Sequence, residues 1–333
     1  MALVSVNIVN YNTKKYLKSC LDSVLNQSYK DFEVLFIDNA STDGSVEFIK
    51  QNYPDIKVIV NKKNLGYAKA HNQGIKRSKG EYILCLNPDV ILDKDYIKNA
   101  LAVFETKNKV GAVTGKLLMW DLTKNKETDI IDSAGFRIFR SHRVIDRGQG
   151  DKDLGQYNRE EEIFGVSGAA PIYSRKVLED IETAGTGSYK YFDEDFFSYK
   201  EDIDLSWRLR LRGWKCFYTP KALAWHARRA KGVMSDLEVA RAREKKSEKI
   251  NYYSYKNHLT LLLKNETLSN LVRYFPWIFW YELKKFGYIL VFEPKTLGAL
   301  FKFFVQFPLT LRKRKAIMER KVVKAEEIKK WIK

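Results

Sequence analysis

The feature that most constrains the fold is the regular alternation of two residue patterns in the first 115 residues. Short runs rich in β-branched and aromatic residues predict strands, and the segments between them carry apolar residues at helical spacing. Strands joined by crossover helices form a mainly parallel sheet with helices on its faces, so an α/β fold is predicted. The predicted strands are residues 3–10, 32–38, 57–60, 81–86 and 110–114, and the predicted helices are residues 14–26, 43–51, 66–77 and 93–106.

Polar residues stand where three of the predicted strands end. Asn10 and Asp38 close the first two strands, and Asn87 and Asp89 follow the fourth, where Pro88 cannot continue a strand. In open α/β sheets, ligands bind at this carboxyl edge. Because carboxylates there can hold a divalent metal ion and, through it, a phosphate, the pattern indicates a ligand site. The alternative is a set of ordinary turns, in which the same residue types are common.

The turn over residues 37–45 allows two interpretations of Asp38. Its carboxylate can accept hydrogen bonds from a nucleobase or from a ribose hydroxyl. The alternative is that the turn only caps the helix that follows, a role that we predict for Ser41 or Thr42 in either case.

Residues 64–74 combine small and amide side chains, among them Asn64, Gly66 and Asn72. Small residues let a loop and the start of a helix come close to a ligand. The spacing differs from the glycine fingerprint of dinucleotide-binding proteins. Asn72 is expected on the inner side of the predicted helix.

A second acidic cluster begins a predicted helix at residue 201. Asp202 lies in the first turn, where the helix dipole favours negative charge, and Gly213 marks the C-terminal stop. The alternative is that these acids only complement the dipole and pair with Arg208, which explains Asp204 better than Asp202.

His226 follows the end of another predicted strand, at residues 222–225. It could reach the sheet edge that carries Asp89, so a role as a metal ligand is predicted. Arg228 and Arg229 come directly after it and could neutralise a phosphate. A solvated basic loop is the alternative for these two arginines.

The formal charge of +18 is concentrated at the C-terminal end. Residues 226–333 hold 25 Lys and Arg against 10 Asp and Glu, a net charge of +15. This asymmetry suggests an anionic partner, such as a membrane surface, a nucleic acid or a phosphorylated lipid.

Two apolar and aromatic runs, residues 271–281 and 297–309, lie in this basic segment. Both are shorter than the roughly 20 apolar residues that a helix needs to cross a bilayer. The second precedes the basic run 312–315, a composition typical of helices that lie in the membrane interface. The alternative is a helical cap that packs on the domain or on a second subunit.

The cysteines and the N-terminus suggest the cellular compartment. Cys20, Cys85 and Cys216 show no metal-ligand spacing and are predicted to be reduced and buried, as in the cytoplasm. The chain enters an apolar strand without a basic leader, so no signal peptide is predicted.

Six motifs in a fixed order closely resemble the family-2 inverting glycosyltransferases of the GT-A fold, over residues 3–230. They are Val9-Asn10-Tyr11-Asn12, the 38–44 turn, Asn64-Leu65-Gly66-Tyr67-Ala68 with Asn72, Asn87-Pro88-Asp89, Glu201-Asp202-Ile203-Asp204 and Trp225-His226. The Leu86-Asn87-Pro88-Asp89 form looks most like the rhamnosyltransferase branch. The resemblance implies a GT-A fold with a C-terminal helical tail: a nucleotide-sugar-binding half at 1–115, an acceptor-binding and catalytic half at 116–232, and the tail at 233–333.

The resemblance also implies roles for single residues. Asp89 would bind Mg2+ or Mn2+ at the donor diphosphate, with His226 completing the metal site, and Asp202 would be the general base. The implied donor-binding residues are Asn10, Asp38, Asn64, Gly66, Asn72, Asn87 and Asp89. Many family members have Asp where this chain has Asn87, which removes one charge from the implied metal site.

The implied function is transfer of rhamnose or another hexose in cell-surface polysaccharide synthesis. dTDP-rhamnose is the favoured donor, with UDP- and GDP-sugars as alternatives, and the acceptor is a glycan or a polyprenyl-linked glycan. The expected location is cytoplasmic, on the anionic inner face of the plasma membrane.

Two other classes of function fit parts of the sequence. Tyr252, Tyr253 and Tyr255 lie among lysines, a composition found in proteins that bind single-stranded nucleic acid. Acids at strand ends would repel a nucleic-acid backbone, which makes this class less suitable. A nucleotide-sugar-binding scaffold without turnover is the third possibility.

Overall fold

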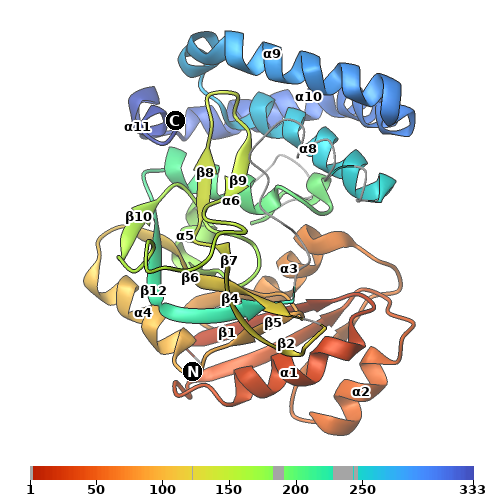
Figure 1. Cartoon of the computed structure of the whole chain (residues 1–333), viewed down its shortest axis with the longest axis vertical. Coiled ribbons are helices and arrows are strands. Elements are labelled where there is room, and N and C mark those ends of the chain that lie inside the picture. The colour runs from red at the N-terminus through yellow and green to blue at the C-terminus, as the bar shows by residue number, and fades with distance from the viewer. Residues whose placement is uncertain (1–2, 122, 183–190, 228–242, 244–246) are drawn as a thin grey trace.

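A mixed ten-stranded sheet forms the centre of the protein (Figure 1). The computed structural model describes residues 3–121, 123–182, 191–227, 243 and 247–333. The strand order is β10-β12-β6-β11-β4-β1-β2-β3, with β5 paired to β12 and β7 paired to β6. The strands of this sheet are β1 (Val4–Asn10), β2 (Phe32–Asp38), β3 (Lys57–Val60), β4 (Tyr82–Leu86), β5 (Val90–Leu92), β6 (Val110–Asp121), β7 (Lys126–Ser133), β10 (Glu161–Ile163), β11 (Ile172–Ser174) and β12 (Lys215–His226). Strands β8 (Phe136–Ile138) and β9 (Val144–Asp146) form a separate two-stranded sheet.

The predicted parallel core of the sheet is confirmed. Strand β1 pairs in parallel with β2 and β4, and β2 pairs in parallel with β3. Strand β11 then runs antiparallel between β4 and β6, and β12 is parallel to β6. The carboxyl ends of β1, β2 and β4 therefore meet at one edge of the sheet, as the sequence predicted.

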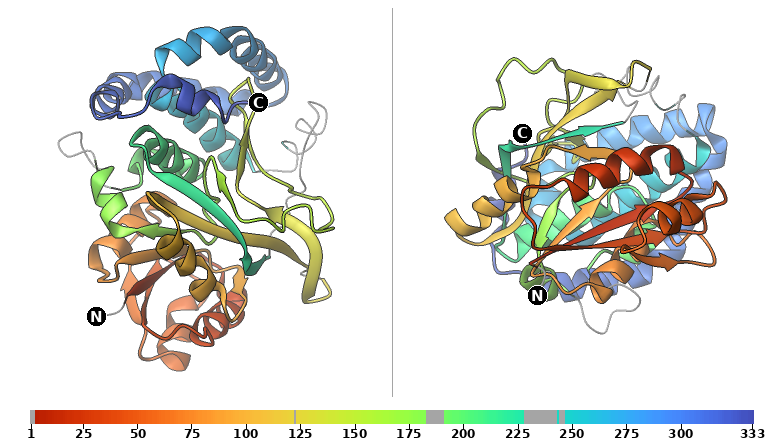
Figure 2. Two further views of the ribbon diagram at one scale, coloured as in Figure 1. Left: turned by 90° about the vertical axis from the view of Figure 1, so that its left-hand side faces the viewer. Right: turned by 90° about the horizontal axis from the view of Figure 1, so that it is seen from below.

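Helices cover the sheet, and the C-terminal helices form a further layer at one end of the molecule (Figures 1 and 2). The helices are α1 (Lys14–Leu25), α2 (Ser45–Asn52), α3 (Gly66–Arg77), α4 (Tyr96–Thr106), α5 (Arg175–Asp180), α6 (Glu201–Leu211), α8 (Glu248–Asn265), α9 (Leu268–Phe292), α10 (Gly298–Glu319) and α11 (Ala325–Lys329). The described residues also include two short 3-10 helices, η1 (Glu194–Phe196) and η2 (Pro294–Leu297).

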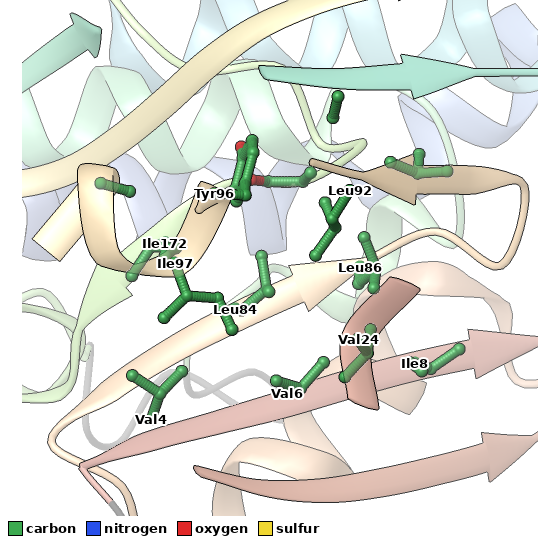
Figure 3. Close-up of a cluster of buried hydrophobic side chains, with 14 of the residues drawn as sticks. Val4, Val6, Ile8, Val24, Leu84, Leu86, Leu92, Tyr96, Ile97 and Ile172 are labelled. Atoms are coloured by element: carbon green, nitrogen blue, oxygen red, sulfur yellow. The ribbon is translucent and has the colours of Figure 1, made fainter. Parts of the chain in front are cut away.

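The main core lies between the sheet and helices α1 and α4 (Figure 3). Alternate residues of β1, including Val4, Val6 and Ile8, face this core together with Leu84 and Leu86 of β4. A strand in the middle of a covered sheet is apolar on both faces, which explains the continuous apolar run of β4. Cys20, Cys85 and Cys216 are buried and free, as predicted.

Three details differ from the sequence-based prediction. Strand β6 runs on to Asp121, and a short strand, β5, precedes α4. Residues 215–226 form one long strand with a register irregularity between Thr219 and Leu223, whereas the sequence predicted one strand at residues 215–219 and another at residues 222–225. Helix α2 begins at Ser45 after a left-handed Gly44 without a side-chain cap, so the predicted capping role of Ser41 or Thr42 is wrong.

The C-terminal helices pack on the domain through an aromatic cluster. Trp207 of α6 and Phe164 lie in this cluster with Leu261 of α8, Tyr274 of α9 and Ile317 of α10. The predicted alternative of a packed helical cap therefore describes the inner side of these helices. Among the helices in the described ranges, none combines the length and the continuous apolar character that crossing a bilayer requires.

Candidate active site

Asn10 and Asp38 are paired residues at the ends of the neighbouring strands β1 and β2. Asn10 Nδ2 donates to Asp38 Oδ1 at 2.8 Å and to Ser41 Oγ at 2.9 Å, and Asp38 Oδ2 accepts from the Ser41 backbone N–H at 2.8 Å. Both side chains are 0% exposed. Direct contact of Asp38 with a nucleobase or ribose is therefore not available in this structure. The pair instead fixes the turn that follows β2.

Residues 11 and 12, which follow β1, lie next to this pair and are exposed. The Asn12 backbone N–H donates to Ser41 Oγ at 2.9 Å, and Asn12 Oδ1 accepts from the Thr42 N–H at 2.8 Å. These bonds place Tyr11, whose side chain is exposed, beside the turn after β2. Its position directly after the strand end was the sequence signal that could have identified it as a candidate.

Gly66 and Asn64 shape the start of α3. Gly66 has a left-handed backbone with a φ of +79°, and a Cβ there would lie 2.3 Å from the Phe197 carbonyl oxygen, so only glycine fits. Asn64 Oδ1 accepts from the Gly66 N–H at 2.8 Å. Asn39 Nδ2 donates to the Gly66 carbonyl at 3.2 Å, which connects this turn to the end of β2.

Asn72 is buried and joins α3 to a distant segment. Its Oδ1 accepts from the Phe192 N–H, and its Nδ2 donates to the Phe192 carbonyl, both at 2.9 Å. Asn72 Nδ2 also donates to Glu194 Oε1 at 3.3 Å, so Asn72 positions the segment that leads into α6.

Asp89 and His226 face each other at the edge of the sheet. His226 Nε2 lies 3.3 Å from Asp89 Oδ1, and the Ala227 N–H donates to the Asp89 carbonyl at 2.8 Å. The antiparallel pairing of β5 with β12 sets His226 opposite Val90, next to Asp89. The expectation that His226 reaches Asp89 is thus confirmed.

A second carboxylate, that of Asp132, orients His226 by contacting the ring nitrogen that does not face Asp89. Asp132 lies at the buried end of β7, and its Oδ2 is 2.8 Å from His226 Nδ1. Burial alone would lower the pKa of His226, but the Asp89 and Asp132 carboxylates raise it to about 10. Sequence reasoning missed Asp132, because it lies 94 residues from His226 and only the sheet brings the two together.

The residues present fit a divalent metal ion. If a metal ion took the place of the Nε2 proton while Asp132 accepts the Nδ1 proton, the Nε2 lone pair would be free on the side of Asp89, the arrangement in which metal-binding histidines are held. Within the described ranges, no group of three or more His, Cys, Asp or Glu side chains is placed to hold a metal ion. The fit is therefore to an ion that takes its other ligands from phosphate and water.

Asp202 lies in the first turn of α6. Its Oδ2 accepts from the Gly168 N–H at 2.9 Å, and its Oδ1 accepts from the Ile203 N–H at 2.8 Å. Burial raises the pKa of Asp202, against the lowering effect of these two donors. The pKa of the neighbouring Glu201 is raised well above its usual value by burial and by Asp202.

One loop brings Asp202 and the Asn87–Asp89 turn together. The Ala169 carbonyl accepts from the Asn87 N–H at 2.8 Å, while the adjacent Gly168 donates to Asp202. Tyr67 Oη donates to the Gly168 carbonyl at 2.7 Å, which adds the start of α3 to this group. The predicted residues of strands β1, β2 and β4 and helices α3 and α6 are thus joined by a continuous set of contacts. Arg228 and Arg229 lie outside the described residues.

The predicted pairing of Asp204 with Arg208 is confirmed, since Arg208 Nε donates to Asp204 Oδ2 at 2.9 Å. Gly213, the predicted stop, follows the end of α6 with a φ of +78°. Asp204 therefore has a structural partner on its own helix, which leaves Asp202 as the acid of this turn that faces the 166–169 loop.

Helix α8 supports the loop that precedes Asp202. Phe197, Tyr199 and Lys200 all have positive φ values, an uncommon conformation for residues other than glycine. Asn257 Nδ2 donates to the carbonyls of Phe196, Ser198 and Tyr199 at 2.7 to 2.9 Å. The C-terminal helices therefore hold a strained loop next to the candidate base.

Buried ion pairs reinforce this support. Lys264 Nζ of α8 lies 2.6 Å from Asp193 Oδ2 and 2.6 Å from Asp204 Oδ1. Lys313 Nζ of α10 lies 2.6 Å from Asp193 Oδ1 and 2.5 Å from Asp195 Oδ2. Burial would raise the pKa of Asp193, but the two lysines hold it well below its usual range.

The nucleic-acid interpretation of the tail loses part of its stacking surface. Tyr255 is buried against Ile289 of α9 and Ala299 of α10, and Tyr253 stacks on Phe197. Lys256 is buried with its ammonium group donating to the Asp195 carbonyl, so it is not available to a nucleotide.

The sequence is similar to that of known glycosyltransferases. Residues 5–182 match the domain described as glycosyl transferase family 2. The poly-beta-1,6-N-acetyl-D-glucosamine synthase of Staphylococcus epidermidis is 29% identical over 229 residues, which are 67% of this chain and 49% of that protein. The synthase of the same name from Staphylococcus aureus strain COL is 29% identical over 222 residues, 65% of this chain and 47% of that protein. The chain spans about half the length of these curated relatives.

Two solved structures share the fold. GalNAc-T7, solved with UDP, GalNAc and Mn2+, superposes with a TM-score of 0.55 at 17% identity, over 81% of this chain and 53% of that one. The mannosyltransferase PcManGT from Pyrobaculum calidifontis, in complex with GDP-Man and Mn2+, superposes with a TM-score of 0.51 at 15% identity, over 96% of this chain and 85% of that one. The GT-A fold expected from the sequence is thereby confirmed. The rhamnosyltransferase branch stays a prediction.

Proposed function

The chain belongs to glycosyl transferase family 2, and on that premise we propose that it is a metal-dependent inverting glycosyltransferase. It moves a sugar from a nucleotide-sugar donor to a glycan or polyprenyl-linked glycan acceptor. The observation that carries the proposal is that one loop contacts both the candidate metal-binding residues and the candidate base. The Asp89–His226 pair and Asp202 are both joined to residues 168–169, directly or through Asn87.

Asp89 and His226 would hold Mg2+ or Mn2+, with Asp132 orienting the imidazole from behind. The metal ion, when bound, neutralises the charge that develops on the departing nucleoside diphosphate. Asn87 contributes an amide beside Asp89 where a second carboxylate would add negative charge. We therefore expect the metal ion to bind more weakly to the free protein than together with the diphosphate.

Asp202 would act as the general base toward the acceptor hydroxyl. Its two backbone donors fix the carboxylate at the start of α6, and its raised pKa makes it a stronger base than an ordinary Asp. The base removes the proton while the hydroxyl attacks the anomeric carbon from the face opposite the diphosphate. Attack from that face inverts the anomeric configuration.

The donor's nucleoside would lie at the ends of β1 and β2. Asn10 and Asp38 hold the turn, Asn64 and Gly66 shape the facing loop, and Asn72 fixes the segment behind it. The exposed ring of Tyr11 offers a face on which a nucleobase can stack. Asp38 would then act by positioning the turn, and Arg228 and Arg229 remain candidates for contact with phosphate.

The donor is a dTDP-, UDP- or GDP-sugar. Rhamnose is the sugar that the motif at residues 86–89 favours, and the names of the staphylococcal relatives add N-acetylglucosamine. The site of action proposed is the cytoplasmic face of the plasma membrane, in the synthesis of cell-surface polysaccharide.

A panel of nucleoside diphosphates identifies the base. We expect thermal stabilisation by one nucleoside diphosphate that is larger with Mn2+ than without it. Equal stabilisation with and without Mn2+ would contradict the metal assignment, and no stabilisation by any of them would contradict nucleotide-sugar binding.

The substitution Asp202→Asn tests the base. Transfer is expected to fall by about 10²- to 10⁴-fold while donor binding is kept, because the amide still accepts from Gly168 but cannot take a proton. Glu201→Gln is the matched control, since Glu201 already favours its neutral form. The wild-type rate should fall as the pH drops through the raised pKa of Asp202, whose proton blocks the base. Full transfer by Asp202→Asn would remove Asp202 from this role, and a wild type without transfer or donor hydrolysis would leave the scaffold alternative.

A further inference from the structure

Helix α9 buries polar side chains together with apolar ones on its inner side and exposes mainly apolar side chains on its outer side. On the inner side, Asn270 is fully buried, and Glu282 Oε1 lies 2.8 Å from His258 Nε2 and 3.9 Å from Lys285 Nζ. Burial would raise the pKa of Glu282, but Lys285 and His258 lower it to about 2. The outer side exposes Leu268, Val272, Phe275, Phe279, Trp280, Leu283, Phe286, Leu290, Val291 and Phe292. We call these ten residues the apolar face.

Helix α9, which carries the apolar face, lies at the end of the molecule opposite β1 and β2 (Figure 1). Helix α9 has 25 residues, a length of about 37 Å. Phe275 and Phe279 stack on each other while their side chains remain 57% and 53% exposed. Soluble monomers rarely expose a continuous apolar surface of this extent, so the apolar face is expected to have a partner.

The helix that follows repeats the pattern on a smaller scale. Phe301, Phe304 and Val305 of α10 are exposed, with Lys302 among them and Arg312 one to two turns further on. Aromatic side chains next to basic ones are the composition of helices that lie in the bilayer interface.

A basic basin of about 680 Å³ opens beside the N-terminal half of α9. Its lining includes four cationic side chains, Arg140, Arg273, Lys329 and Lys330, and one carboxylate, Glu326. Arg140 lies over the Trp277 ring, 5.3 Å from its centroid, and Trp277 also lines the basin. The basin thus combines positive charge with an aromatic wall at the border of the apolar face, which suits a phosphate that is attached to an apolar chain.

The positive charge of the C-terminal helices favours an anionic bilayer over a second copy of the chain as the partner of the apolar face. Residues 247–333 hold 18 Lys and Arg against 7 Asp and Glu. Lys264 and Lys313 are used in buried ion pairs, but the exposed basic side chains would face each other and repel in a symmetric dimer, whereas an anionic bilayer attracts them.

We propose that the apolar face lies in the interface of an anionic phospholipid bilayer and that the basic basin binds a lipid phosphate headgroup. The proposal rests on the membrane location given in the proposed function and names the surface that provides it. The bound chemistry is a phosphodiester or phosphomonoester on an acyl or prenyl chain.

Sedimentation of the full chain with vesicles tests the proposal. The wild type is expected to bind vesicles of phosphatidylcholine with phosphatidylglycerol, and to bind vesicles of phosphatidylcholine alone much more weakly. The double substitution of Phe275→Ser and Phe279→Ser should weaken binding to both vesicles by at least about tenfold. Leu154→Ser is the matched control, because Leu154 is 79% exposed on a loop outside this surface.

A second double variant, with its own control, tests the binding of a headgroup in the basic basin. Arg273→Gln with Lys329→Gln should weaken binding to the anionic vesicles by about thirtyfold at low salt and leave binding to neutral vesicles unchanged. Lys15→Gln with Lys18→Gln on α1 removes the same charge elsewhere and should have little effect. If inorganic phosphate stabilises the protein without vesicles, and this effect is lost in Arg273→Gln with Lys329→Gln, the basin is a free-phosphate site and the headgroup assignment is wrong.

Two further results would overturn the proposal. The first is equal binding of the wild type and the Phe275→Ser, Phe279→Ser variant to anionic vesicles. The second is a wild-type dimer in light scattering without lipid that the same two substitutions convert to a monomer, because the apolar face would then belong to a second copy. Mn2+-dependent nucleotide binding, measured in parallel, should be unchanged in all these variants, so a failure of membrane binding is distinct from a failure of the transferase proposal.

Discussion

The sheet edge and the C-terminal helices distribute polar groups in opposite ways. At the sheet edge, apolar side chains fill the core, and the polar ones collect where strands end, as at Asp89 and His226. In the C-terminal helices, Lys264 and Lys313 are buried, while Phe279 on the outer surface is exposed. The comparison teaches that the high positive charge of the tail has two uses. Some of the basic side chains form internal ion pairs, and only the others can interact with an anionic partner.

The two regions also depend on each other. The C-terminal helices carry the cations and amides that neutralise and hold residues 193–200, directly before the candidate base. The family match ends at residue 182, before this segment. The geometry of the base is therefore decided partly by helices outside the part of the chain that the family match covers.

The largest expected effect comes from breaking the buried contact between the two regions. Lys264→Met leaves Asp193 and Asp204 without one buried cation, which should lower the free energy of unfolding by about 3–5 kcal/mol. Lys315→Met is the control, because Lys315 is exposed and lies 3.9 Å from Glu319; a change within about 0.5 kcal/mol is expected there. Urea denaturation measures both. Equal effects would show that the buried pairs do not connect the two regions energetically.

Two adjacent apolar residues of α9, one buried and one exposed, test whether the outer surface of this helix is free in solution. Ile278 is 8% exposed and belongs to the aromatic cluster, so Ile278→Ala should cost about 2–5 kcal/mol of stability. Phe279→Ala removes a larger side chain, but from the outer surface, and should change stability by less than about 0.5 kcal/mol. Thermal unfolding without lipid compares the two. A larger loss for Phe279→Ala would mean that its ring is covered in solution.

The smallest expected effect concerns the sheet edge. Asp132→Asn keeps the size of the side chain but removes the carboxylate that orients His226, and should weaken Mn2+-dependent nucleotide binding by about 10- to 100-fold. Asp129→Asn, on an exposed part of the same strand, is the control. Titration calorimetry with Mn2+ and the preferred nucleoside diphosphate measures the change. Unchanged affinity in Asp132→Asn would separate His226 from the metal site.

Much of the fold of residues 1–115 could be predicted from the sequence because its signals are local. Strands β2 and β3 and helix α3 have the predicted bounds, since each is a short run with its own period and turn residues. Asp89 was predicted as a site residue because a strand end is visible in sequence, and Asp202 because the family resemblance implies its role. The loop at residues 168–169, which joins them, is set by tertiary contacts.

Other features depended on residues that are far apart in the chain. The sequence could not show that Asp38 is fully buried by Asn10 and Ser41, or that Asp132 would lie behind His226. Nor could it divide the basic residues of the tail between inside and outside, because Lys264 and Lys315 look alike until their neighbours are known.

The sequence alone determined the α/β class, the acidic residues at strand and helix ends, and the basic, aromatic character of the tail. These properties come from the period, type and order of neighbouring residues. Only the tertiary structure decided which acids face each other, which lysines are buried, and which side of α9 is apolar toward the outside. The physical reason is that burial and ion pairing depend on distances between segments, and those distances are set when the sheet and the C-terminal helices pack together.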